Sequence, residues 1–456
     1  MFIQTKTLVN LEKQITIPVV KNRLQQIRHA VHFRLLKGLR KAGFFMLIAD
    51  LLLRHGPLFL IRKIRSDIFS TYTNHKNKAT GIHIAGYLRQ ILGTGEAARL
   101  FAGMIKNSNI PFTLINLPAG FHPRLSRKES LQFDFHLSRK IFFDTTLIFA
   151  NANLLNDIFM LFPEFKKSRR RAAVWWWEFE DGMDDFIEGF KFINEVVVFS
   201  NFVKAAVEKI LPEDKNVTKL LFPFIPENLS NLDRGRILNK YDIGSDKFVF
   251  YFNFDFASSI WRKNPVGILS AFEKAFSRND AVHLVFKTTN HTWFSDKAEF
   301  FSSSLSTHPL SKNITWIAKP VSRNEHNDLL RAIDCFVSLH RGEGFGLGLL
   351  ESMYIGKPVV ATNYGGNVEF MKLHNSMLVN YSMRPCVDDY AVYRHVTRCA
   401  EPDIDHAAHC MRALYENPEK GTALGVRARQ DILQQFDPQK CAEEYKTWIA
   451  GSLRKE

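Results

Sequence analysis

Two carboxylates eight residues apart, Glu343 and Glu351, flank a glycine-rich turn in the stretch HRGEGFGLGLLESM (340–353). Such a turn, between a predicted strand and a predicted helix, lets the backbone approach a ligand closely, and the free N–H groups of the helix start favour an anion such as phosphate. Leu347 and Glu351 share one helix face, with the carboxylate one turn, roughly 6 Å, from the helix start. The pattern predicts a bound phosphate with sugar hydroxyls beside it.

Two adjacent cations, Arg262 and Lys263, lie between a predicted strand end and a predicted helix start in FDFASSIWRKNP (254–265). Positive charge there would neutralise a diphosphate and stabilise the negative charge that develops on a phosphate leaving group. A solvated basic pair ahead of a helix is the alternative interpretation. We predict that Arg262, Lys263 and Glu343 are catalytic residues.

Gly95 belongs to the sequence GTGEAA (93–98), which has the GxGxxA spacing of a dinucleotide-binding turn. Two details oppose that interpretation. The glycines come six residues after the predicted strand 81–87, and no carboxylate that could bind ribose occurs between Glu96 and Glu129. Two interpretations of Gly95 remain, a ligand contact and a purely structural turn.

Two polar residues, Asn151 and Glu178, follow predicted strands of the first half of the chain. We predict that both face the bound ligand. Asn151 can hydrogen-bond a hydroxyl but cannot act as a base near neutral pH. Glu178 follows the run Trp175–Trp177, whose alternating rings are most readily explained as core, and its carboxylate could orient a hydroxyl of the ligand.

From residue 81 onward, short β-branched or aromatic runs alternate with helical patterns, which is typical of parallel sheets joined by crossover helices. The predicted strands are 81–87, 112–116, 146–150, 173–177 and 195–200, then 247–254, 281–287, 313–318, 334–340 and 357–362. The turn-rich segment 223–235 separates the two halves as a linker. Ligands of such sheets bind at the carboxyl ends of the strands, so we expect the site in the cleft between two domains.

Capping patterns mark several helix boundaries. Ser200, Asn264 and Ser322 are predicted N-caps, and Ser322 begins a capping box with Glu325. Gly356 is predicted to end its helix in the left-handed conformation.

The positive charge is concentrated at the start of the sequence. Lys and Arg (61) exceed Asp and Glu (46) by 15 over 456 residues, whereas residues 1–80 hold 15 basic and three acidic residues, a net of +12. The apolar stretch 42–61 is interrupted by Asp50, Arg54, His55 and Pro57, and about 20 uninterrupted apolar residues are needed to span a bilayer. An amphipathic segment on an anionic membrane surface is the favoured interpretation, and a helix packed on the protein is the alternative.

Location and partners follow from the same composition. The sequence start lacks the pattern of a secretory signal, and the five cysteines form no CxxC pair, which favours the reducing cytoplasm. We expect a cytoplasmic protein peripherally associated with the inner face of the membrane. Nucleic acid is not expected as a partner, because the basic segment does not interleave aromatics with cations on a sheet. With no HExxH motif and no DxD at a strand end, we expect no metal and no other cofactor.

The E-x7-E arrangement with GFG inside it resembles the nucleotide-sugar site of retaining glycosyltransferases that have the GT-B fold, of the family-4 type (glycosyl transferases group 1). The likeness extends over roughly residues 80–440. It implies that Glu351 holds the ribose of the donor nucleotide. It also implies that Glu343 and the turn that leads into Leu347 hold the transferred sugar and diphosphate through the amides of Gly344, Phe345 and Gly346. An Arg/Lys pair such as 262–263 serves the diphosphate in this family.

Other segments agree with this resemblance or depart from it. The run Trp175–Glu178 is similar to the YWxWE segment of bacterial mannosyltransferase-like members. Because the resemblance assigns the acceptor to the first domain, it implies that Glu178 and Asn151 lie on the acceptor side. Asn151 lies where many relatives carry a His that contacts the donor sugar, which implies a polar contact here rather than an acid–base one. Gly365 stands where a Ser is more usual in the donor-side loop.

The resemblance implies an α/β architecture in which two Rossmann-like, doubly wound domains face each other across a cleft. Its parts are a basic helical extension (1–79), an acceptor-binding domain (80–225), a donor-binding domain (226–425) and helices that pack back across both (426–456). It implies transfer of a hexose, with mannose slightly favoured, from a nucleoside-diphosphate sugar to an acceptor hydroxyl with retention of configuration. The basic segment 1–80 favours a glycan or lipid-linked acceptor, in polysaccharide or lipopolysaccharide synthesis. A sugar phosphorylase or epimerase on the same fold, and a lipid-surface binding protein without catalysis, remain open.

Overall fold

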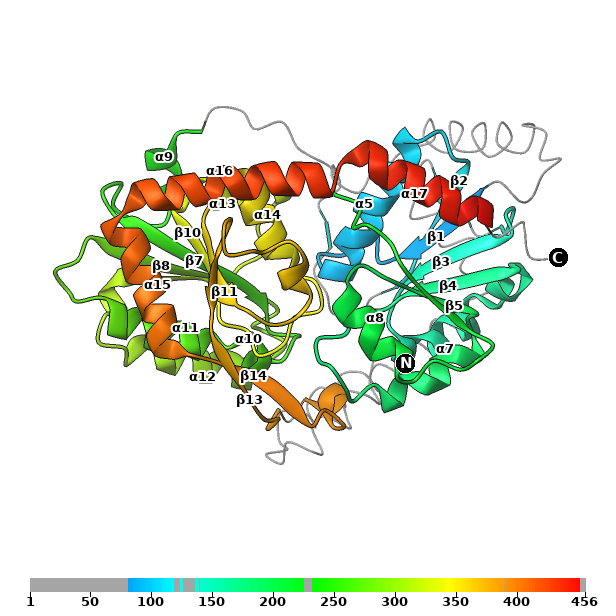
Figure 1. Ribbon diagram of the computed structural model, residues 1–456, viewed down its shortest axis with the longest axis horizontal. Helices are drawn as coiled ribbons and strands as arrows, with labels where there is room; N and C mark the ends of the chain where they lie inside the picture. Colours follow the sequence, from blue (N-terminus) through cyan, green and yellow to red (C-terminus); the bar gives the residue numbers. More distant parts are fainter. Residues whose placement is uncertain are drawn as a thin grey trace, which may run out of the picture.

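Two parallel sheets, one in each half of the chain, form the two domains of an elongated molecule (Figure 1). The computed structural model describes residues 81–451 apart from 119–123, 126–135, 139, 225–231 and 389. The extension predicted for 1–79 and most of the predicted linker therefore lie outside the described residues. Within the described part of the chain, none of the helices combines the length and apolar character needed to span a bilayer.

The first sheet has the strand order β2-β1-β3-β4-β5-β6, and each neighbouring pair is parallel. Its strands are β1 (Ile82–Gly86), β2 (Phe112–Asn116), β3 (Thr145–Phe149), β4 (Arg170–Val174), β5 (Glu195–Val198) and β6 (Asn216–Lys219). They are connected by α5 (Gly93–Asn107), α7 (Ala152–Leu161), η2 (Pro163–Lys167), η3 (Asp184–Lys191) and α8 (Asn201–Glu208). Strands β1, β3 and β5 are buried along their whole length, as expected when helices cover both faces of a parallel sheet.

The second sheet has the order β12-β11-β10-β7-β8-β9 and is also parallel. Its strands are β7 (Phe248–Asp255), β8 (Val282–Thr289), β9 (Ile314–Ile317), β10 (Cys335–Ser338), β11 (Val359–Thr362) and β12 (Met377–Val379). Its helices are α9 (Arg234–Asn239), α10 (Ile260–Lys263), α11 (Pro265–Ala275), α12 (Ser295–Ser306), η4 (Ser311–Asn313), α13 (Arg323–Ala332), α14 (Leu347–Ile355), η5 (Gly366–Glu369) and α15 (Ile404–Glu416). A separate antiparallel ribbon consists of β13 (Tyr381–Pro385) and β14 (Arg398–Pro402), with η6 (Ala391–Tyr393) between them.

Three predicted N-caps are confirmed, each side chain accepting a hydrogen bond from the amide three residues on: Ser200, Asn264 and Ser322. Gly356 ends α14 with a φ of 87°, as predicted. Glu325 departs from the predicted capping box, because its carboxylate accepts from Lys240 and from the Tyr241 hydroxyl.

The strand predicted at 173–177 lies earlier in the chain, since β4 ends at Val174. The following tryptophans pack under η3 instead, with Trp175 and Trp177 each within 5.4 Å of the Phe186 ring centroid. The apolar run continues past the end of β4 because these rings fill the core. The predicted strand therefore lies three residues too far along the chain. The short strands β6 and β12 to β14 were not predicted.

Two helices at the end of the described chain join the domains. Helix α16 (Pro418–Gln435) packs on α14 of the second domain, whereas α17 (Pro438–Gly451) packs on α5 of the first (Figure 1). The Tyr445 hydroxyl of α17 donates to the Leu221 carbonyl at 2.6 Å. The domain boundary predicted at 425/426 falls inside α16, so the chain crosses between the domains about ten residues later.

Candidate functional site

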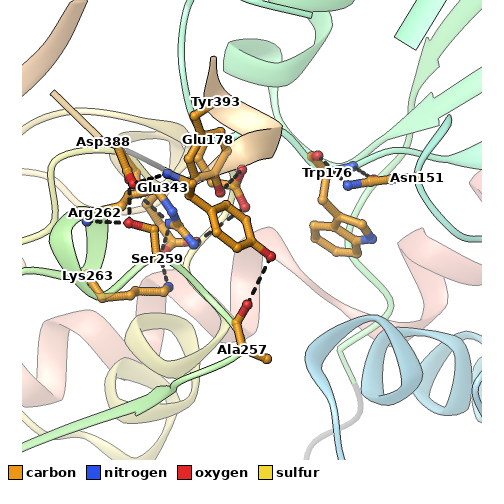
Figure 2. A network of polar contacts seen from close by, with 12 residues as sticks. Asn151, Trp176, Glu178, Ala257, Ser259, Arg262, Lys263, Glu343, Asp388 and Tyr393 are labelled. Atoms are coloured by element: carbon orange, nitrogen blue, oxygen red, sulfur yellow. Dashed lines mark hydrogen bonds and ion pairs between the residues drawn. The ribbon is translucent and has the colours of Figure 1, made fainter. Parts of the chain in front are cut away.

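Predicted site residues from both domains meet around Arg262, which lies beside Glu178 of the first domain and Glu343 of the second (Figure 2). Glu178 follows β4 of the first domain. Lys263 ends α10, which follows β7, and Glu343 follows β10 of the second domain. The site therefore lies between the domains, in a region that we call the cleft, at the strand ends where parallel α/β sheets bind their ligands.

Lys263 and Glu343 form an ion pair that opens onto this cleft. The Nζ of Lys263 lies 2.5 Å from Oε2 of Glu343, and the two side chains keep 19% and 15% of their surface exposed. Burial alone would raise the pKa of Glu343, but Lys263 and Arg262 outweigh burial and hold that pKa at about 2. Glu343 is therefore a carboxylate at neutral pH.

Arg262 lies behind this pair, with only 3% of its surface exposed. Its Nη1 donates to the Gly342 carbonyl at 2.7 Å and lies 3.8 Å from Oε2 of Glu343. Its Nη2 lies 3.6 Å from Oε1 of Glu178, which belongs to the other domain. A guanidinium so buried, with one carboxylate from each domain beside it, joins the domains. The direct contact predicted between Arg262 and a diphosphate is therefore revised.

The turn around α10 explains why two adjacent cations differ so much in exposure. The Ser259 side chain accepts from the Arg262 amide at 3.0 Å and donates to Asp388, which anchors the start of α10 (Figure 2). Asn264 ends α10 in the left-handed conformation, and its Nδ2 donates to the Leu339 carbonyl at 2.8 Å. These contacts hold Arg262 inside and leave Lys263 at the cleft.

The glycine-rich turn packs directly against the first domain. A Cβ at Gly342 would lie 2.5 Å from the Glu178 carbonyl oxygen, and one at Gly344 would lie 2.4 Å from that of Trp177. The Ser200 hydroxyl also donates to the Gly344 carbonyl at 2.7 Å. The absence of a side chain at Gly344 thus allows the backbone of the other domain, rather than a ligand, to approach.

The rest of the turn leads into α14. The Phe345 ring is buried and stacks on Phe222 of the first domain with ring centroids 4.5 Å apart, so it belongs to the core that joins the domains. Gly346 has a φ of 92° and precedes Leu347 with no capping side chain among the described residues. The first amides of α14 thus lack a side-chain cap in this part of the chain, and the anion site that the sequence predicts there stays a prediction.

Glu351 lies one turn into α14, with only 6% of its surface exposed. Its Oε1 lies 2.7 Å from Nη1 of Arg323, and its Oε2 lies 3.3 Å from Nε2 of His326. Burial would raise the pKa of Glu351, but Arg323 and His326 hold it at about 2. Arg323 also lies 3.8 Å from Oε1 of Glu96 in the first turn of α5, so this carboxylate too lies beside the first domain.

Two predicted contacts of the first domain have structural explanations. A Cβ at Gly95 would lie 2.5 Å from the Tyr87 carbonyl, which explains the glycine through the packing of α5. The Asn151 side chain accepts from the Trp176 amide at 2.7 Å and donates to the Trp176 carbonyl at 3.1 Å (Figure 2). Because both ends of its amide bind backbone, Asn151 ties α7 to the end of β4, and its predicted acceptor contact is revised.

Two residues not identified from the sequence complete the site. His340 is fully buried, donates from Nε2 to the Tyr364 carbonyl at 2.9 Å, and accepts on Nδ1 from Ser338. Burial lowers the pKa of His340 to about 4, so the ring is neutral, and it holds the loop that follows β11. Tyr393 donates its hydroxyl to Oε2 of Glu178 at 3.0 Å, across 215 residues of sequence. The motif HRGEGFG begins with His340, but no local pattern points to Tyr393.

No metal-binding arrangement of three or more His, Cys, Asp or Glu side chains occurs in the described part of the chain. All five cysteines are unpaired. The expected metal independence stays a prediction.

Comparison with known proteins gives matches of two kinds. The profile of the family "Glycosyl transferases group 1" matches residues 238–384, which cover the E-x7-E motif. Alpha-1,3/1,6-mannosyltransferase ALG2 of Dictyostelium discoideum is 22% identical over 280 residues, which are 56% of this chain and 60% of that protein. Sucrose synthase 1 of Hordeum vulgare is 30% identical over 119 residues, or 24% of this chain and 15% of the synthase. The chain thus spans less than two thirds of the length of these relatives.

Solved structures resemble the whole two-domain body. HepE of Anabaena, in complex with UDP and glucose, superposes with a TM-score of 0.61 at 13% identity, covering 82% of this chain and 100% of that one. Sucrose-phosphate synthase of Thermosynechococcus elongatus has a TM-score of 0.57 at 12% identity, again with 82% and 100% coverage. At such identities the likeness shows the fold alone. We conclude that the chain has the two-domain GT-B fold and carries a domain of the glycosyl transferases group 1 family.

Proposed function

We propose that the chain is a retaining glycosyltransferase that moves a hexose from a nucleoside-diphosphate sugar to an acceptor hydroxyl. One observation carries the proposal. Glu343, which is partly exposed and paired with Lys263, precedes the turn that leads into the uncapped start of α14, and Glu178 of the other domain reaches the same cluster through Arg262. In this arrangement the second domain can bind an anionic donor and the first domain can bind an acceptor.

Lys263 and the first amides of α14 are the groups that bind the donor diphosphate. Positive charge and N–H dipoles at this point stabilise the charge that grows as the bond between sugar and diphosphate breaks. Glu343 accepts hydrogen bonds from hydroxyls of the transferred sugar. Glu351 accepts from the ribose, and the ribose then shares this carboxylate with Arg323, which occupies it here.

Glu178 accepts a hydrogen bond from the acceptor hydroxyl on the first domain. The acceptor oxygen forms its bond on the face of the sugar from which the diphosphate departs, which retains the configuration. The acceptor proton passes to a leaving phosphate oxygen, so atoms and charge balance without a protein base. This route suits the cluster, because Glu343 is fully ionised and already bound to Lys263.

A donor panel tests this proposal. The protein is incubated with UDP-glucose, UDP-N-acetylglucosamine, GDP-mannose and ADP-glucose, with octyl glycosides as acceptors, and release of nucleoside diphosphate is followed. We expect one donor to be consumed and Glu351→Ala to abolish consumption while the circular dichroism spectrum is preserved. Full activity of Glu351→Ala would refute the assigned donor site.

The identity of the donor is a finer proposal. Mannose from GDP-mannose is slightly favoured, supported by the similarity to a protein named as a mannosyltransferase. UDP-glucose is the competitor, since the HepE structure was determined in complex with it. The same panel ranks them. A phosphorylase would need inorganic phosphate in place of the octyl glycoside, and an epimerase would convert the donor without any acceptor.

We also propose that residues 1–80 hold the protein at an anionic membrane surface, where a lipid-linked or lipopolysaccharide-type acceptor is found. The support is their net charge of +12, since the remaining 376 residues carry only +3. Flotation of the full chain with vesicles containing phosphatidylglycerol, compared with a chain lacking 1–80, tests this. Equal flotation of both chains would refute it.

A further inference from the structure

A short segment between β13 and β14 crosses from the second domain to the first. We call residues 390–397 the cleft strap. Its Tyr390 hydroxyl donates to the Ala257 carbonyl of the second domain at 3.0 Å. Its far end reaches the first domain, where the Thr397 amide donates to Asp181 at 3.2 Å and Arg394 pairs with Asp185. The strap therefore contacts both walls of the cleft.

The first domain is shaped to receive this strap. Gly182 has a φ of 80°, and a Cβ there would lie 2.6 Å from the Val396 nitrogen, so only glycine allows the backbones to approach. The Tyr393 ring packs edge-on against Trp177 and Phe179, with centroids 5.5 and 4.9 Å away. Three rings and a close backbone contact thus hold the strap in one position.

Tyr393 delivers a single polar group from the strap to the site. Its hydroxyl donates to Oε2 of Glu178, whose Oε1 lies 3.6 Å from Nη2 of Arg262 (Figure 2). Burial raises the pKa of Tyr393 well above its ordinary value, although Arg262 opposes the shift, so the phenol stays protonated and donates. Glu178 is therefore held from two directions by two groups of the second domain.

The exposed fractions of the three side chains distinguish the one that can contact a ligand from the two that support it. Glu178 keeps 19% of its side chain exposed, whereas Arg262 keeps 3% and the Tyr393 residue 5%. Of these three, Glu178 is the one open to the cleft. Tyr393 acts on a ligand only through that carboxylate, whereas Arg262 also lies 3.8 Å from Glu343.

We propose that Tyr393 is a positioning residue that fixes Glu178 for binding the acceptor hydroxyl, and that it does so only when the strap spans both domains. The inference rests on the proposed glycosyltransferase function and adds to it a residue that determines acceptor binding. Opening of the cleft would separate Glu178 from Tyr393 and Arg262 together. The acceptor is therefore held only while Tyr393 and Arg262 of the second domain contact Glu178 of the first.

Tyr393→Phe tests this, with Tyr390→Phe as its matched control. Each variant removes one hydroxyl from the same strap, but the hydroxyl of Tyr390 binds a backbone carbonyl of the second domain and not Glu178. Transfer to octyl glycosides and donor hydrolysis in their absence are measured separately in the full chain. We expect Tyr393→Phe to raise the acceptor KM about tenfold, the loss of one hydrogen bond to a charged group, with donor KM and hydrolysis unchanged. Tyr390→Phe stays within about twofold of the wild type.

A double-mutant cycle with Glu178→Gln distinguishes positioning from general support of the fold. If Tyr393 acts through Glu178, Tyr393→Phe adds no further rise in acceptor KM once Glu178 is Gln. An unchanged acceptor KM in Tyr393→Phe, an equal fall of transfer and hydrolysis, or an undiminished effect in the Glu178→Gln background would each overturn the inference alone. A wild-type protein that consumes no donor of the panel, or that glycosylates none of the octyl glycosides, would refute the proposed function and this inference with it.

Discussion

Replacing Arg262 and Lys263 in turn by Met separates the two cations that the sequence presents as a pair. Arg262→Met removes a buried hydrogen bond of 2.7 Å to Gly342 and leaves two carboxylates, Glu178 and Glu343, without their shared cation. Breaking a buried ion pair on one side typically costs 3–5 kcal/mol, and the partial exposure of both carboxylates places this case near about 3 kcal/mol. Lys263→Met removes one ion pair that solvent reaches, worth about 1 kcal/mol or less.

We expect urea unfolding and donor turnover to rank the two variants in opposite orders. We expect Arg262→Met to lose about 3 kcal/mol of unfolding free energy, because the guanidinium joins the domains. We expect Lys263→Met to unfold nearly as the wild type does while transfer falls at least about a hundredfold, as for loss of a group that stabilises developing charge. An Arg262→Met protein that is as stable as the wild type but inactive would refute this reasoning and restore Arg262 as a donor contact.

Three further outcomes follow from the same geometry. The pKa values of Glu343 and Glu351, about 2 in the folded chain, are depressed, so their stabilisation is present above their ordinary pKa and is lost as pH falls through about 2. The free energy of unfolding, measured with urea, should therefore fall between about pH 5 and pH 2 by about 3 kcal/mol for each of the two groups. Glu343→Gln should make this pH dependence shallower, and an equally steep pH profile in this variant would contradict the assignment. Gly344→Ala should destabilise the protein by about 1–3 kcal/mol, since its Cβ would lie 2.4 Å from the Trp177 carbonyl, whereas Gly93→Ala meets nothing within 4 Å and should change stability by less than about 0.5 kcal/mol; equal effects would show that the domains do not meet at this turn. Transfer should survive EDTA without loss, and activity restored only by added Mg²⁺ or Mn²⁺ would refute metal independence.

Local patterns in the sequence were enough to predict most of the framework. A strand or cap depends on a few neighbouring residues, so β2 at 112–116 and the caps at Ser200 and Asn264 occur where their patterns place them. The E-x7-E motif likewise includes its own strand end, turn and helix start, which brings Glu343, the turn and Glu351 into one region. Recognising these elements required no knowledge of distant contacts.

Contacts between distant residues decided the rest. Nothing local distinguishes Arg262 from its neighbour, because its burial comes from Gly342 and Glu178, which lie 80 or more residues away. The amide of Asn151 is satisfied by the backbone of Trp176, a pairing that exists only once β3 and β4 are adjacent. Tyr393 reaches Glu178 across 215 residues, from a segment whose strands are too short and polar to predict.

Proton NMR of the product of one transfer reaction tests the central claim most directly. The full chain is incubated with the donor panel and an octyl glycoside, and the new anomeric proton is compared with that of the donor sugar. We predict that one nucleoside diphosphate is released for each glycoside formed and that donor and product have the same anomeric configuration. We also predict that Lys263→Met forms neither the nucleoside diphosphate nor the glycoside. A product with inverted configuration, or full transfer by Lys263→Met, would contradict the account.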